Sequence, residues 1–149
     1  MQRILRKYES SDLGDLMVTW ESASKLAHPF LPEAFQDQIR HDIPSVYLPN
    51  AETWVMEQDG QVIGFIALIG NEVGAIFVKA EFQGTGAGRA LMGKAVELRG
   101  DLEVEVFKAN GIGRKFYQRY GFELLSESVH EPTGLDVLKL KFIRSKTES

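Results

Sequence analysis

A glycine-rich segment, Gln83-Gly84-Thr85-Gly86-Ala87-Gly88, constrains the fold of this chain more than any other feature. It follows an apolar stretch ending in Ile76-Phe77-Val78, and it precedes a stretch in which Leu91, Ala95 and Leu98 recur at helical spacing. The first turn of a helix has unpaired N–H groups and carries about +0.5 charge. Because glycines let an anion approach the backbone, the segment predicts a phosphate-holding turn between strand and helix, with an unliganded turn as the alternative.

Two nucleotide-binding motifs match this region only in part. The dinucleotide fingerprint G-x-G-x-x-G fails in both registers, because its last glycine would fall on Arg89 or on Leu91. The segment from Gly88 to Ala95 matches G-x-x-x-x-G-K, but Ala95 stands where a magnesium-binding Ser or Thr belongs. That segment also lies within the predicted helix. The sequence therefore disfavours a Rossmann site and a P-loop nucleotide enzyme.

Strands and helices are predicted along the whole chain. Asp59-Gly60 favours a tight hairpin turn, and His28-Pro29 ends the first helix, because a proline disfavours the helical conformation of the residue before it. The predicted order is a strand over 2–9, an N-cap at 10–12, helices from Leu13 to Ala27 and from Pro32 to Pro44, strands over 53–57, 62–69 and 73–78, a helix ending at Gly100, a strand over 102–106, a short helix ending at Gly121, and strands over 122–129 and 135–142. This order predicts an α/β or α+β fold.

Composition narrows the function classes. The length of 149 residues, with 44% apolar and 26% charged residues, predicts one domain over 1–149. The absence of cysteine excludes disulfides, thiolate metal sites and a cysteine nucleophile. His28, His41 and His130 are too scattered for a metal-binding pattern, so no metal is expected. A net charge of −4 argues against nucleic-acid and membrane partners. The segment Met1–Lys7 lacks the apolar run of a signal peptide, which predicts a cytoplasmic location.

Two motifs together resemble those of a known family. Gln83-x-x-Gly86-x-Gly88 resembles the Q/R-x-x-G-x-G/A pyrophosphate loop of the GNAT N-acetyltransferases. Downstream, Asn110-(x5)-Phe116-Tyr117-(x3)-Gly121-Phe122 resembles the second signature of that family. The stretch from Trp20 to Leu31 is similar to the YjaB-like branch. One departure is Gly113, where the family often has Ala, and we expect it to loosen the start of its helix.

The resemblance implies a fold, a cosubstrate and a set of site residues. The fold is the GNAT fold, with about seven strands in a mixed sheet and about four helices on its faces. The cosubstrate is acetyl-CoA, and Tyr117 matches the tyrosine that protonates the leaving thiolate. A phenol with a pKa near 10 is protonated at neutral pH, so it can donate. The implied cofactor-binding residues are Ile76, Phe77, Val78, Gln83, Gly84, Thr85, Gly86, Ala87, Gly88, Arg89, Asn110 and Tyr117. Tyr117 could instead be an aromatic core residue, and Asn110 a turn-former.

The general base is predicted from the alternation of one strand. Glu103 and Glu105 point to the face opposite Leu102, Val104 and Val106. Glu105, five residues before Asn110, resembles the base position of some GNAT enzymes. A carboxylate partly shielded from water has a raised pKa, which suits a base. Glu72 is the second candidate for the base, and a solvated strand face is the alternative. The predicted acceptor-binding residues are His28, Phe30, Glu72 and Glu103.

The sequence therefore predicts an N-acetyltransferase in which an amine attacks acetyl-CoA directly in a ternary complex. No covalent nucleophile is needed, which suits a chain without cysteine. The acceptor is expected to be a small-molecule or peptide amine, and the protein a monomer or homodimer. The alternative is a non-catalytic acyl-CoA-binding sensor of the same fold, although a pure binder needs neither Tyr117 nor a nearby carboxylate.

Overall fold

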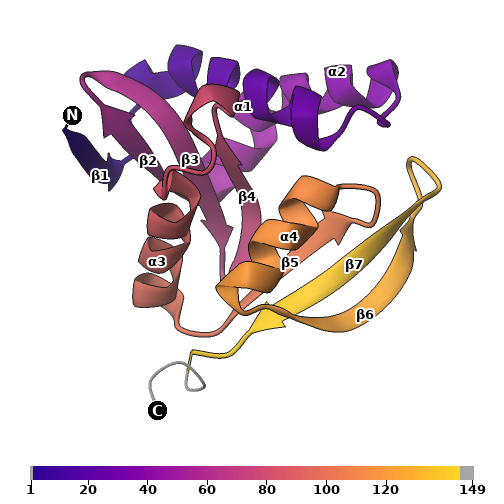
Figure 1. Ribbon diagram of the computed structural model, residues 1–149. Helices are drawn as coiled ribbons and strands as arrows, with labels where there is room; N and C mark the ends of the chain where they lie inside the picture. Colours follow the sequence, from indigo (N-terminus) through magenta and orange to yellow (C-terminus); the bar gives the residue numbers. More distant parts are fainter. Residues whose placement is uncertain (1, 145–149) are drawn as a thin grey trace.

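The chain forms one mixed sheet with helices on both faces. We describe residues 2–144 from a computed structural model. The sheet has seven strands in the order β1-β2-β3-β4-β5-β7-β6 (Figure 1). β4 and β5 are parallel neighbours, and every other neighbouring pair is antiparallel. The strands are β1 (Arg3–Lys7), β2 (Glu52–Gln58), β3 (Gln61–Ile69), β4 (Glu72–Val78), β5 (Leu102–Phe107), β6 (Glu123–His130) and β7 (Leu135–Phe142).

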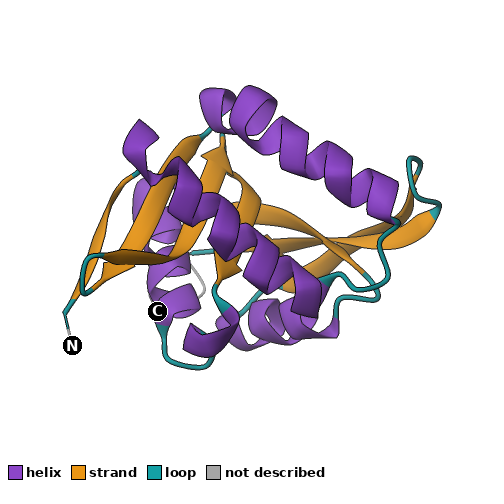
Figure 2. Cartoon of the chain, turned by 90° about the horizontal axis from the view of Figure 1, so that it is seen from above, coloured by secondary structure: helices purple, strands orange, loops and turns teal. Residues whose placement is uncertain are grey.

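Helices lie on both faces of the sheet (Figure 2). They are α1 (Leu13–Ala27), α2 (Glu33–Asp42), α3 (Ala87–Arg99) and α4 (Gly111–Tyr120). α1 packs on one face through Leu16 and Trp20, which meet Val55 and Phe65 of the sheet. α3 and α4 pack on the other face in a larger core around Leu91. The predicted α/β architecture, with its seven strands and four α-helices, is confirmed.

The parallel pair β4–β5 separates soon after it begins. Pairing covers only Glu72 with Glu103 and Val73 with Val104. The register of β3 against β4 then shifts at a bulge next to Gly74. Although β4 is the central strand, residues 74–77 are at least partly exposed. The sheet is therefore open between β4 and β5, beside the carboxyl ends of both strands.

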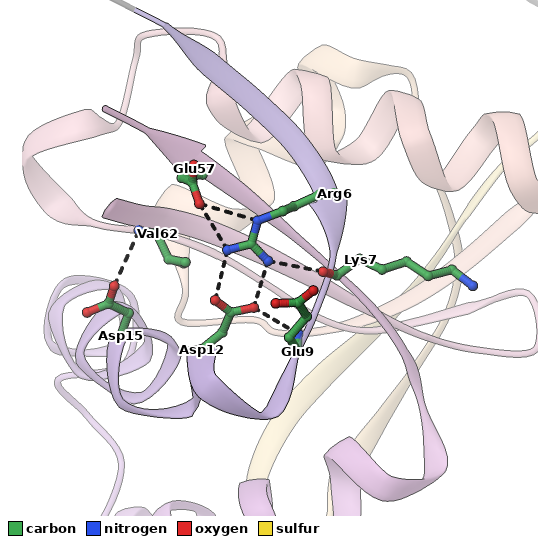
Figure 3. Close-up of polar contacts among 7 residues, drawn as sticks. All are labelled: Arg6, Lys7, Glu9, Asp12, Asp15, Glu57 and Val62. Carbon is green, nitrogen blue, oxygen red and sulfur yellow. Dashed lines mark hydrogen bonds and ion pairs between the residues drawn. The ribbon is translucent and has the colours of Figure 1, made fainter. Parts of the chain in front are cut away.

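An ion-pair network joins the first strand to the first helix (Figure 3). The Arg6 guanidinium donates two hydrogen bonds to Asp12, at 2.8 and 2.9 Å, and bonds Glu57 at 3.0 Å. Asp12 also accepts from the backbone N–H of Glu9, and the hydrogen bonds from Arg6 hold the pKa of Asp12 below its ordinary value. The network fixes the approach of α1 to the sheet.

The structure agrees with most predicted boundaries and refines two. The hairpin at Asp59-Gly60 is confirmed, since both residues have positive φ. The predicted N-cap at 10–12 is found at Asp12, the N-cap residue of α1. Residues 10–12 also form a short 3₁₀ turn (η1, Ser10–Asp12), and the Asp12 side chain bonds Arg6 and the Glu9 N–H instead of an N–H group of α1. The α-helix ends at Asp42, close to the predicted end at Pro44. The chain then continues through a π-helical turn (η2, Ile43–Tyr47), where proline is tolerated because a first turn needs no N–H from it.

The helices carry no membrane span in the described part of the chain. Within residues 2–144 none of them combines the length and the apolar composition needed to cross a bilayer.

Candidate acyl-transfer site

The glycine-rich segment forms a tight turn into α3. Gly86 is the N-cap residue and has φ +91°, a left-handed conformation that favours glycine. The first backbone hydrogen bond of the helix runs from Ala90 N–H to Gly86 O, so the N–H groups of 87–89 precede the intrahelical ladder. A Cβ added at Gly86 would meet no atom within 4 Å. The turn therefore combines N–H groups outside the intrahelical ladder with open space at Gly86, as suits an anion site.

Side chains hold this turn in place from both sides. Gln83 donates from Nε2 to the carbonyl oxygen of Val78, at 3.1 Å, which ties the turn to the end of β4. Arg3 of β1 donates to the Thr85 backbone carbonyl at 3.1 Å and to Thr85 Oγ1 at 2.8 Å. Gln83 and Thr85 thus have structural partners within the protein, and the N–H groups at the start of α3 remain available.

The two sequence motifs meet where α3 approaches α4. A Cβ at Gly88 would lie 3.1 Å from the ring of Phe116, so the glycine allows close approach of the two helices. One residue on, the Arg89 guanidinium lies over the Tyr120 ring at 5.2 Å. This contact places the anion turn beside the helix that carries Tyr117.

Tyr117 packs in the core at the end of α4. Its ring contacts Phe116 and Phe122, and the residue is buried. Burial raises the pKa of the Tyr117 phenol above its ordinary value. The phenol therefore keeps its proton at neutral pH, as a proton donor must.

Asn110 caps the start of α4. Its Oδ1 accepts from the Gly113 N–H at 2.9 Å, the usual contact of an N-cap with the third helical residue. A Cβ at position 113 would lie 2.5 Å from Asn110 Nδ2. Gly113 therefore makes room for the Asn110 side chain that caps the helix, which gives a structural reason for glycine at this position.

His28 links α1 to this cap. Its Nε2 lies 3.4 Å from Asn110 Nδ2, and its Nδ1 lies 3.2 Å from Ser24 Oγ. Because Asn110 Oδ1 accepts from Gly113, its amide nitrogen must donate, so His28 accepts at Nε2 and carries its proton on Nδ1. Burial lowers the pKa of His28 to about 4, so the ring is neutral at pH 7.

A cavity of about 380 Å³ lies between the α1–α2 layer and the open part of the sheet. Its floor includes Phe77 of β4, and Glu105 and Phe107 of β5, so it reaches the separation of these strands. Its walls are mainly aromatic and aliphatic, and include Trp20, His28, Leu31, Phe35, Ile39, Ile43, Tyr47, Leu48, Phe65, His130 and Val137. Glu105 shares its strand face with Glu103, as predicted, but it is exposed, so the protein alone does not shield it from water.

The structure separates the predicted acceptor residues. His28 lines the cavity, as does the predicted base Glu105. Glu72 and Glu103 lie opposite each other in the backbone register at the start of β4 and β5, and neither lines the cavity. Phe30 borders a second, smaller hollow and packs against His28 and Phe107.

Sequence reasoning missed Phe107 and His130 as parts of one site. His130 follows 23 residues after Phe107 in the printed sequence, yet the two rings lie 5.2 Å apart in the cavity wall. Phe107 continues the alternation that places Glu103 and Glu105 on the open face, and this was the available signal. No local pattern identifies His130. Among the described residues, no three His, Cys, Asp or Glu side chains gather in a way that could hold a metal ion.

Known proteins resemble this chain over most of its length. The profile described as "Acetyltransferase (GNAT) domain" matches residues 49–124. The chain is 29% identical to peptidyl-lysine N-acetyltransferase YiaC of Escherichia coli, over 89% of this chain and 91% of that protein. It is 26% identical to peptidyl-lysine N-acetyltransferase YjaB of the same organism, over 87% and 88%.

Solved structures agree with the fold. The solution structure of apo-form YjaB from E. coli has a TM-score of 0.86 at 25% identity, covering 96% of this chain and 99% of that one. PaiA N-acetyltransferase from Thermoplasma acidophilum, solved in complex with coenzyme A, has a TM-score of 0.76 at 19% identity, covering 95% and 100%. The family profile spans β4, the anion turn, β5 and α4. The similarity to the relatives covers more of the chain than the profile does. The chain therefore belongs to the GNAT family of N-acetyltransferases, in agreement with the resemblance of its two motifs.

Proposed function

We propose that the protein transfers the acetyl group of acetyl-CoA to a primary amine bound in the cavity, by direct attack in a ternary complex. The observation that supports this proposal is the cavity with Glu105, which reaches the opening where β4 and β5 separate. The anion turn, which follows β4, touches α4 through Gly88 and Phe116, and α4 carries Tyr117. An acyl carrier and an amine could approach this opening from opposite sides.

The residues fit acetyl-CoA as a cosubstrate. The free N–H groups of 87–89 and the open space at Gly86 suit a pyrophosphate. Around Phe77 and Val78, β4 pairs with β3 but not with β5, and this edge of β4 can bond an extended pantetheine chain as an added strand does. A relative of the same fold was solved with coenzyme A, which supports this assignment. Bound there, acetyl-CoA supplies an activated acetyl thioester.

Proton transfers are assigned to two side chains. The amine nitrogen forms a bond to the acetyl carbon while the carbon–sulfur bond breaks. Tyr117 gives its proton to the leaving sulfur, since burial keeps the phenol protonated at neutral pH. Glu105 accepts the proton that the amine loses, directly or through one water, since it lines the cavity. Asn110 holds the start of α4, which positions Tyr117.

The acceptor is an amine, and the relatives suggest one source of it. Two E. coli relatives carry the name peptidyl-lysine N-acetyltransferase, which supports a protein lysine as one candidate acceptor. Small-molecule amines remain the other candidate class. A monomeric or homodimeric assembly, a single domain over 1–149 and a cytoplasmic location complete the proposal, without nucleic acid, membrane or metal.

The test is an assay of two products with one protein. Acetyl-CoA and a panel of amines are incubated with the protein, and both the free CoA thiol and the acetylated amine are measured. We expect both products in equal amounts. Binding of acetyl-CoA in a thermal-shift experiment, without release of CoA on any amine, would favour the acyl-CoA sensor instead.

A further inference from the structure

One wall of the cavity consists of aromatic and imidazole side chains in contact with one another. Phe35 contacts His130 at 5.3 Å between ring centroids, and His130 contacts Phe107 at 5.2 Å. Phe107 contacts His28 at 5.7 Å, and His28 contacts Phe77 at 6.2 Å. This series runs from α2 to β4, and aliphatic side chains of α2 and of the turns after it complete the wall. A volume of about 380 Å³ falls within the range of small-molecule sites.

Carboxylate, Lys and Arg side chains are almost absent from the described lining of this cavity. Glu105 is the only Asp, Glu, Lys or Arg among the described residues that line it. His28 is neutral, and both its ring nitrogens face protein partners, Ser24 and Asn110. One carboxylate can compensate one ammonium group, and a second cation in this volume would lack a partner.

The other carboxylates of this sheet face cannot supply that partner. Glu103 forms an ion pair with Lys139 at 3.3 Å. Glu72 lies opposite Glu103 in the β4–β5 pair, and neither residue lines the cavity. The acidic side chains that the sequence placed near the acceptor therefore lie outside the space that the acceptor's body would fill.

We propose that the acceptor is a primary monoamine carried on an uncharged apolar arm, alkyl or aryl, with its amino group at Glu105 and its arm among the rings. The proposal rests on the proposed function and narrows its substrate class. It excludes polyamines and amino sugars with several amino groups, whose additional ammonium groups would be buried without a counter-charge. It also disfavours a peptide lysine, since the described side chains that line the cavity beyond Glu105 are aliphatic and aromatic, and only Trp20, Tyr47 and the two imidazoles among them have polar atoms.

Two amines of equal size test the charge. Hexylamine and 1,5-diaminopentane have the same number of heavy atoms. The far end of hexylamine is a methyl group, whereas the far end of the diamine is a second ammonium group. We expect kcat/KM for hexylamine to exceed that for the diamine by about 100-fold or more, because the diamine must shed a proton from a group with a pKa near 10.4 to enter. Hexylamine should also exceed butylamine by roughly 15-fold, at about fourfold for each of two buried methylenes.

One substitution should reverse the preference. Phe35→Glu adds a second carboxylate to the cavity wall from α2, a helix without buried residues, so the fold tolerates it. We expect the ratio of hexylamine to diamine to fall by at least 10-fold. Val46→Glu is the matched control, because Val46 is 46% exposed and does not line the cavity. The control should keep the ratio of the unmodified protein.

The outcomes separate this proposal from the proposed function. Turnover of amines with a preference for the diamine, or for Nα-acetyl-lysine methylamide, over hexylamine would overturn the apolar-arm acceptor and leave the acetyltransferase standing. Without turnover of any amine, thermal shifts with the same amines decide. Stabilisation by hexylamine alone would support an apolar amine site even though the proposed function fails. Equal stabilisation by all the amines, or none by any of them, would overturn the apolar amine site.

Discussion

The cofactor side and the acceptor side of the site are built in different ways. The cofactor side consists of the turn into α3 and of α4, in which each key contact lies close to a glycine or a cap, such as Gly86, Gly88 or Gly113. The proposed acceptor side is a cavity lined by described residues from α1, α2, the turns after it and five strands, β3 to β7. The first side depends on backbone conformation and on close approach at glycines, and the second depends on which side chains line the cavity. We therefore expect substitutions on the cofactor side to abolish function, and those on the acceptor side to redirect or weaken it.

The largest effect is expected at the anion turn. Gly86→Asp places a carboxylate in the open space in front of the free N–H groups, so acetyl-CoA binding should fall below detection. Gly86→Asn is the matched control, because it has the same size and backbone strain without the charge, and Asn tolerates a positive φ. Isothermal titration with acetyl-CoA checks both. Equal affinities for the two variants would show that charge is not the cause and would break the assignment of the turn.

Tyr117→Phe should give the next largest effect. The ring keeps its contacts with Phe116 and Phe122, and only the hydroxyl is lost. General acid catalysis contributes about 10² to 10⁴-fold, so kcat should fall within that range while the Kd of acetyl-CoA changes little. Pre-steady-state measurement of the acetyl-transfer step provides the check. A fall of less than threefold would place Tyr117 in the core only.

Glu105→Gln tests the proposed general base, which lies where the cavity reaches the opening between β4 and β5. We expect kcat/KM at neutral pH to fall by about 10- to 100-fold, and part of the loss to return at high pH, where free amine is abundant. Glu72→Gln is the control, since Glu72 lies outside the cavity, and it should leave the pH profile unchanged. A higher KM with an unchanged kcat would mean that Glu105 binds the ammonium group without accepting its proton. A larger loss in the Glu72 variant would move the base to β4.

His28 should give the smallest effect, and it appears in stability. Its pKa is about 4 in the folded protein and near 6.5 in the unfolded chain, so the unfolded chain binds more protons between these values. Stability is therefore lost as the pH falls from 6.5 towards 4, by about 2 kcal/mol at pH 5. Urea unfolding of the wild type and of His28→Gln at pH 7.5 and pH 5 checks this. Equal losses in both proteins would show that His28 titrates normally.

Local features of the sequence predicted much of the fold. The end of α1 before His28-Pro29, the hairpin at Asp59-Gly60 and the helix after Gly86 all follow from residues within a few positions, and the structure confirms each. The π-helical turn that follows α2 was not predicted, because proline near the end of one helix is equally compatible with the first turn of the next.

The two sides of the candidate site differ in what the sequence could predict. The residues predicted to bind the cofactor, from Gln83 to Arg89 together with Asn110, form two short motifs, so a resemblance could assign them residue by residue. The cavity has no such motif. His28 and Asn110 are separated by 82 positions, and Phe35 and His130 by still more, so only the folded chain brings each pair into contact. Glu72 and Glu103 were predicted at the acceptor, and neither lines the cavity.

The sequence by itself determined the order of strands and helices, the glycine turn with its exposed N–H groups, and the identity of the residues in both motifs. These depend on backbone preferences and on side-chain periodicity, which act over a few residues. The tertiary structure alone decided that β4 and β5 separate after two residue pairs, that Gly88 meets Phe116, and that one carboxylate faces a cavity of rings. The reason is physical: which side chains meet depends on how whole elements pack, and packing is settled by the sum of many weak contacts across the chain.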